Sequence, residues 1–225
     1  MSAELALAAF AAATESHLVD EPRSVRFARF KASFDGAAAL ERLRVAGYRF
    51  LARSDVDFPP LLGAIHDPPP GLFLRGGADI ELLRRPSVAL VGARACSSYG
   101  RQVARRLGRE LAAAGLVVVS GLARGVDGEA HRGALEAGGS TVAVLGCGID
   151  RDYPAAHRSL AAEIAATGLI VSEYAPGIEP APWRFPARKC GGLAAKPFWL
   201  EQAVVSAVPV VKCAPRVVSV WSRIR

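Results

Sequence analysis

The sequence predicts an α/β protein with a Rossmann-like, mostly parallel sheet and helices on both faces, preceded by a small helical N-terminal region. Short β-branched apolar runs that end in small residues cover residues 88–91, 117–119 and 141–145. A helical pattern follows each run, at residues 100–114, 127–137 and 154–167. This spacing of strands and helices indicates right-handed crossovers, and therefore strands that run parallel.

The apolar face and the ends of the expected helices are also visible in the sequence. In the first helical segment, Val103, Leu107 and Leu111 recur at four-residue spacing and form one apolar face. A glycine follows each helical segment: Gly115, Gly138 and Gly168. Glycine is the usual residue after a helix because it adopts a left-handed conformation without strain. A fourth strand is expected at residues 169–173, and two short strands precede the alternation at residues 48–51 and 72–76.

Three regions are expected along the chain: a small helical domain at residues 1–50, an extended Rossmann-like domain at 51–188 and a C-terminal tail at 189–225. In the first region, Phe27, Phe30 and Phe34 recur at three- and four-residue spacing. This spacing puts the three rings on one helical face, which is more typical of a core than of a platform for stacking bases.

The composition favours an acidic partner. The 225 residues include 28 basic and 21 acidic ones, a formal net charge of +7, which suits a nucleic acid or a nucleotide. The four cysteines have neither the spacing of a zinc site nor that of a disulfide framework, so a reducing cytosol is expected. Since no segment approaches the ~20 apolar residues of a membrane span, we expect a cytoplasmic protein without membrane contact.

The first two strand ends deliver glycine together with arginine. Gly92 and Arg94 follow the first strand, whereas Gly121 and Arg124 follow the second. The carboxyl ends of parallel strands lie side by side, so their free backbone N–H groups and the adjoining helix N-termini form an anion site. The third strand ends in Gly146-Cys147-Gly148 and is expected to join this edge. A phosphate-bearing ligand follows from this arrangement.

Residues 50–188 resemble the DNA-processing protein A (DprA/Smf) family. The matching motifs occur in the family's order at residues 54–62, 67–70, 91–94 with 98–100, 120–127 with 130–131, 143–150 with 153–154, 172–174 and 185–188. The segment at 120–127, which reads Ser-Gly-Leu-Ala-Arg-Gly-Val-Asp, is the most specific of these.

The resemblance implies a non-enzymatic protein that binds single-stranded DNA, transfers it to a RecA-type recombinase and supports natural transformation. It also implies an extended Rossmann domain, a possible homodimer, and neither a metal nor another cofactor. The family's DNA-contacting positions fall on Gly92, Arg94, Ser120, Gly121, Arg124, Gly125, Phe185, Arg188 and Lys189. At these positions the arginines would pair with phosphates. The glycines would let a phosphate approach backbone amides, and Phe185 would either stack on a base or lie in the core.

Catalytic interpretations have less support. His131 lies four residues after Asp127, but no serine or cysteine nucleophile is paired with it, so a structural brace between helix and loop is favoured and Asp127 is expected to cap its helix. Asp150 and Asp152 lack a metal-ligand pattern and are expected in a turn.

One alternative function is a nucleotide-processing N-ribohydrolase of the lysine-decarboxylase-like group, but the Pro-Gly-Gly-x-Gly-Thr stretch of that group is absent from this sequence. An NAD-linked oxidoreductase would need a G-x-G-x-x-G segment, which is also absent.

The chain departs from the family pattern after Arg188. From Lys189 onward it has one acidic residue, Glu201, against six basic ones. We interpret this tail as the product of a frameshift or a truncation, so a non-functional truncated family member is an alternative function. The other interpretation is a genuinely divergent end, in which residues 203–205 and 208–211 still supply a strand. The frameshift interpretation predicts family-like residues in another reading frame beyond codon 188. It also predicts exposed apolar surface and aggregation, because strands and a covering helix would be missing.

Overall fold

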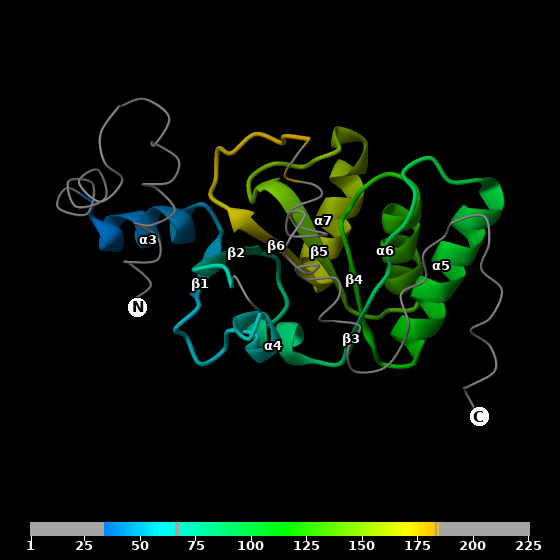
Figure 1. The fold of residues 1–225 in the computed structure, drawn as a ribbon, viewed down its shortest axis with the longest axis horizontal. Helices are drawn as coiled ribbons and strands as arrows, with labels where there is room; N and C mark the ends of the chain where they lie inside the picture. Colours follow the sequence, from blue (N-terminus) through cyan, green and yellow to red (C-terminus); the bar gives the residue numbers. More distant parts are fainter. Residues whose placement is uncertain (1–33, 66–67, 183, 185–225) are drawn as a thin grey trace.

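The computed structural model describes residues 34–65, 68–182 and 184. Their core is one six-stranded sheet with the strand order β1-β2-β6-β5-β4-β3. The pairs β3–β4, β4–β5 and β5–β6 are parallel, whereas β1–β2 and β2–β6 are antiparallel. Figure 1 shows this sheet between α3 at one end and α5 at the other. The predicted α/β class with a mostly parallel sheet is confirmed.

The strands are β1 (Arg49–Ala52), β2 (Gly71–Arg75), β3 (Ser87–Ala89), β4 (Val117–Ser120), β5 (Thr141–Gly148) and β6 (Leu169–Tyr174). The α-helices are α3 (Gly36–Val45), α4 (Pro60–Gly63), α5 (Ser98–Ala113), α6 (Val126–Glu136) and α7 (Arg158–Thr167), with 3₁₀ turns η1 (Ile80–Arg84) and η2 (Ala155–His157). No helix among them is long and apolar enough to cross a membrane.

Helices α5, α6 and α7 cover one face of the sheet. Strands β3, β4, β5 and β6 follow one another in both sequence and space, so each right-handed crossover puts its helix on the same side. Helices α5 and α6 pack closely because both carry glycine at the contact. A Cβ on Gly108 would lie 2.2 Å from the Ala130 carbonyl oxygen. The fully buried residues of α5 are therefore the small ones, Ala104, Gly108 and Ala112, while the predicted face of Val103, Leu107 and Leu111 is half-buried.

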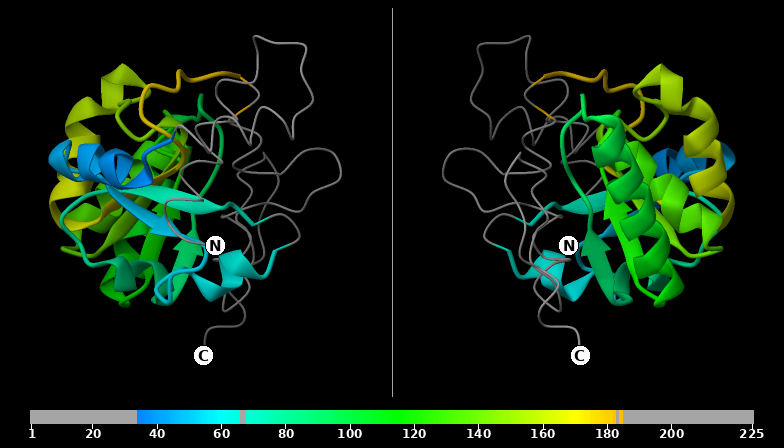
Figure 2. Two further views of the ribbon diagram at one scale, coloured as in Figure 1. Left: turned by 90° about the vertical axis from the view of Figure 1, so that its left-hand side faces the viewer. Right: turned by 90° about the vertical axis from the view of Figure 1, so that its right-hand side faces the viewer.

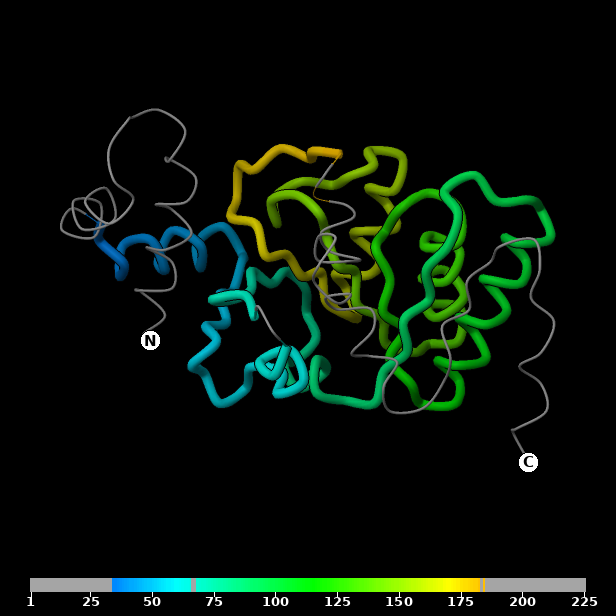
Figure 3. The backbone as a smooth tube through the Cα atoms, in the orientation of Figure 1, coloured from blue at the N-terminus to red at the C-terminus, as the bar shows by residue number. Residues whose placement is uncertain are grey.

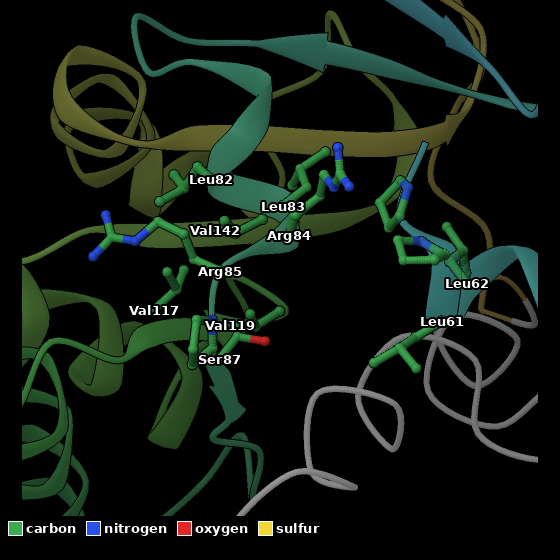
Figure 4. Close-up of a pocket in the computed structure, with 13 residues that line it drawn as sticks. Leu61, Leu62, Leu82, Leu83, Arg84, Arg85, Ser87, Val117, Val119 and Val142 are labelled. Atoms are coloured by element: carbon green, nitrogen blue, oxygen red, sulfur yellow. The ribbon is translucent and has the colours of Figure 1, made fainter. Parts of the chain in front are cut away.

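The opposite face is covered by the short elements α4 and η1, as Figure 2 shows for α4. Leu62 of α4 and Leu82 of η1 pack on alternate residues of the sheet, which include Val119 and Val142. An apolar cavity of about 220 Å³ lies between these elements and the strands (Figure 4). Thus helices lie on both faces, as expected, but the described part of the chain covers them unequally.

The described part of the N-terminal region is helical, in agreement with the sequence. Asp35 caps α3, with its carboxylate accepting the Ala38 N–H at 2.9 Å. Leu43 is buried and Phe34 is half-buried, and both pack against the core that includes Phe73 of β2. Phe34 is thus a core residue; Phe27 and Phe30 lie outside the described residues. The expected domain boundary after residue 50 falls within β1.

A segment at residues 175–182 follows β6 and runs along the carboxyl edge of the sheet (Figure 3). It is tied to the end of β5. The Gly148 N–H donates to the Ile178 carbonyl at 2.8 Å, and the Gly177 N–H donates to the Asp150 carboxylate at 2.9 Å. This segment leads the chain toward the loops that follow the parallel strands.

Candidate nucleic-acid interface

A cavity of about 510 Å³ opens at the carboxyl edge of the three adjacent strands β3, β4 and β5. Its lining residues come from the three loops that follow those strands: Arg94, Ala95, Gly121, Ala123, Arg124, Tyr153, Pro154 and Ala155. The volume is in the range of small-ligand sites. The sequence-based expectation that loops after the first two strands meet at one edge is met by Arg94, Gly121 and Arg124.

The charge of this cavity favours an anion. Arg94 and Arg124 are both exposed, and within residues 34–65, 68–182 and 184 no carboxylate lines the cavity. A guanidinium presents a planar fork of N–H donors that matches two oxygens of a phosphate. The cavity also lies at the topological edge where α/β sheets usually hold their ligands.

Gly92 and Gly125 shape the walls of the cavity. A Cβ on Gly92 would lie 2.7 Å from Cγ2 of Val126, at the start of α6. A Cβ on Gly125 would lie 2.3 Å from the Ala93 carbonyl oxygen, and Gly125 has a φ of +78°. Neither glycine is among the lining residues. In the structure they therefore permit the close packing of two loops, and the phosphate approach expected from the sequence stays a prediction.

Ser120 lies inside the sheet. It is fully buried, and its Oγ donates a hydrogen bond to the Leu90 carbonyl oxygen at 2.6 Å. This bond joins the end of β4 to the residue that follows β3. The expected contact of Ser120 with DNA is not what this geometry provides, because the hydroxyl points toward the neighbouring strand. Ser120 contributes instead by fixing two of the loops relative to each other.

The third strand differs from the expectation. Residues 146–148 belong to β5, which extends through Gly148, so they do not form a glycine loop at the sheet edge. A Cβ on Gly148 would lie 2.7 Å from the Ala175 carbonyl oxygen, so this glycine admits the segment that follows β6. The loop after β5 lines the cavity farther along the chain, through Tyr153, Pro154 and Ala155.

The two aspartates after β5 are held in ion pairs. Asp152 accepts from Arg75 of β2 at 2.6 Å, and both side chains are about one fifth exposed. Asp150 lies 3.5 Å from Arg151, which also pairs with Glu179 at 2.8 Å. Asp150 lies in a turn, as expected, whereas Asp152 lies in the irregular segment just after it. Within the described ranges, no group of three or more His, Cys, Asp and Glu side chains could hold a metal ion.

Asp127 and His131 are buried structural residues of α6. The N-cap of α6 is Gly125, so the expectation that Asp127 caps the helix is wrong; its carboxylate accepts the Ala123 N–H at 3.4 Å from within the first turn. His131 Nδ1 lies 2.7 Å from Oγ1 of Thr141, which donates to the Val118 carbonyl at 2.6 Å. His131 is thus a structural brace, as expected, but it joins α6 to strand β5 and not, as the sequence had suggested, to a loop.

Phe185, Arg188 and Lys189 lie outside the described residues, so their expected contacts stay predictions. The sequence reasoning missed five lining residues: Ala95, Ala123, Tyr153, Pro154 and Ala155. The Tyr-Pro pair after the third strand was available as a signal, because it interrupts the pattern just before the third helix.

These features define a Rossmann-like ligand-binding domain with an arginine-lined cavity at the carboxyl edge of its sheet. The family model described as DNA recombination-mediator protein A matches residues 49–195, which is more than half of the chain. The chain belongs to this family. The sequence departs from the family pattern after Arg188, and the match to the family model ends seven residues beyond that point.

Curated relatives and solved structures agree with this assignment. The chain is 41% identical over 151 residues to Protein Smf of Synechocystis, covering 66% of this chain and 38% of the relative. It is 45% identical over 131 residues to the DNA processing protein DprA of Streptococcus pneumoniae, covering 58% and 45%. The chain thus spans less than half the length of these two relatives.

Two solved structures share the fold. DprA of Streptococcus pneumoniae matches with a TM-score of 0.68 and 29% identity, over 91% of this chain and 79% of that one. DNA processing protein A of Helicobacter pylori, described for its single-stranded DNA binding mode, matches with a TM-score of 0.56 and 37% identity, over 63% and 62%.

Proposed function

We propose that this chain binds single-stranded DNA, with a backbone phosphate held by Arg94 and Arg124 in the cavity at the carboxyl edge of the sheet. The observation that carries the proposal is the convergence of two exposed arginines from different loops on one cavity, to whose lining the described residues contribute no carboxylate. Guanidinium–phosphate pairs supply affinity without reading base identity. A DNA-processing protein that must accept any incoming strand requires this kind of contact.

A binding role suits the cavity better than a catalytic one. Its lining includes no histidine, serine, cysteine or carboxylate, so the described residues place no nucleophile–base pair there. His131 is fully buried and bonded to Thr141. No feature of the cavity favours the N-ribohydrolase alternative. Family membership further supports a cytosolic role in natural transformation, with a homodimer handing the strand to a RecA-type recombinase.

The test is fluorescence anisotropy of a labelled oligo(dT) titrated with the full chain at two salt concentrations. We expect affinity to fall steeply with salt, because each phosphate contact releases counterions with a slope of about −0.7 per contact on single strands. Unlabelled double-stranded DNA should compete poorly. Arg94→Ala should weaken binding about ten- to hundredfold, since a hydrogen bond to a charged group contributes about 1.5–3 kcal/mol.

Arg44→Ala is the matched control. Arg44 also carries one positive charge on the surface, but it lies on α3 next to Glu41, at the other end of the sheet. Its removal should change binding less than twofold. Equal losses in Arg94→Ala and Arg44→Ala would show that only overall charge matters, and equal competition by double-stranded DNA would contradict the strand preference.

A further inference from the structure

His157 connects two walls of the cavity. It is the last residue of η2, whose first residue, Ala155, lines the cavity, and its side chain is only 7% exposed. Its ring Nδ1 lies 2.9 Å from the carbonyl oxygen of Leu122, in the loop after β4. A carbonyl oxygen only accepts hydrogen bonds, so Nδ1 carries the hydrogen and donates it.

The residue that His157 holds has an unusual backbone. Leu122 has a φ of +57°, and among the described residues it is the one non-glycine residue with a positive φ. A leucine in the left-handed region is strained by its own Cβ, and such a conformation persists only where the surroundings impose it. Leu122 lies between Gly121 and Ala123, which both line the cavity. The conformation of Leu122 therefore determines the path of the backbone in that wall of the cavity.

The ring of His157 packs closely against α6. A Cβ on Gly128 of α6 would lie 2.6 Å from its Cε1 atom, so the helix surface closes directly against the ring. The His157 backbone N–H donates to the Pro154 carbonyl at 2.8 Å, and Pro154 also lines the cavity. The side chain of His157 thus contacts α6 and the loop after β4, while its backbone belongs to the segment after β5.

We propose that His157 is a positioning residue: it holds the loop at residues 121–125 in the shape that receives the phosphate between Arg94 and Arg124. The inference rests on the proposed function, since it names the residue that arranges the binding cavity. His157 itself does not line the cavity and touches no ligand. Its effect on binding passes through Leu122, Gly121 and the arginine that follows them.

The experiment compares His157→Leu, which has no donor, with His157→Asn, whose amide can present an N–H near the position of Nδ1. Thr141→Val is the control. It also removes a buried side-chain donor, which bonds the Val118 carbonyl at 2.6 Å and lies 2.7 Å from His131 Nδ1, but Thr141 begins β5 at the opposite edge of the sheet. Each variant is measured by oligo(dT) anisotropy at a temperature where unfolding curves show it folded, and by amide hydrogen exchange of residues 121–125.

We expect His157→Leu to weaken binding at least tenfold and to speed exchange in residues 121–125. His157→Asn should recover binding to within about threefold, and Thr141→Val should stay within twofold. Gly128→Ala should behave like His157→Leu, because its Cβ displaces the ring. The proposal is overturned if His157→Leu leaves exchange in this loop unchanged, if Thr141→Val weakens binding equally, or if His157→Asn does not recover it. Exchange is read without DNA, so failure of the wild-type chain to bind DNA would refute the proposed function separately.

Discussion

Gly125→Ala tests how the cavity is built. In this variant the new Cβ would lie 2.3 Å from the Ala93 carbonyl oxygen and 2.6 Å from that of Arg94. The backbone of Gly125, with a φ of +78° and a ψ of −127°, lies in a region that residues with a Cβ rarely occupy, which costs alanine about 1–3 kcal/mol. Displacing two backbone carbonyls adds about 1–3 kcal/mol, by analogy with overpacked cores. We therefore expect a loss of about 2–6 kcal/mol in the free energy of unfolding, together with movement of the Arg94 loop.

Gly115→Ala separates the two contributions. Gly115 has a φ of +84°, but nothing lies within 4 Å of the position of its Cβ, so this variant should lose only the conformational cost of about 1–2 kcal/mol. Urea unfolding gives both free energies, and anisotropy with oligo(dT) gives both affinities. We expect weakened binding for Gly125→Ala alone. Equal unfolding free energies in the two variants would refute the argument that loop contact requires glycine at position 125.

Two further predictions concern other parts of the molecule. The hydrogen bond from Arg105 lowers the pKa of Glu136 below its ordinary value of 4.5, so this stabilisation is present above that pH and is lost as pH falls through the folded pKa. The difference in Tm between wild type and Glu136→Gln should therefore exist at neutral pH and vanish near pH 2; a constant difference would contradict it. Leu61, which is 48% exposed beside the apolar cavity, promotes self-association if that face is uncovered. Leu61→Glu should then reduce association in sedimentation velocity more than Val56→Glu, which replaces an apolar residue outside the cavity lining; identical profiles would refute this role.

The order of strands and helices was readable from the sequence. Apolar runs such as residues 117–119 and 169–171 are fully buried strands, and the glycines after α5 and α6 adopt the expected positive φ. Gly168 after α7 does not, since its φ is −132°. These signals are local, because the spacing of apolar residues and the glycine that ends a helix can be recognised without reference to distant segments. The sequence did not predict that β2 lies beside β6, because an antiparallel partner is chosen by contacts between residues about a hundred positions apart.

The candidate site also has features that followed from the sequence and features that only the tertiary structure decided. The meeting of Arg94, Gly121 and Arg124 followed from the sequence alone, because parallel strands bring their carboxyl ends to one edge. Only the tertiary structure decided that Ser120 turns inward to Leu90 and that Tyr153 enters the cavity. It also decided that His157 holds Leu122 in a left-handed conformation. Each of these depends on which distant atoms fill the space beside a residue, and the residue type by itself does not specify that.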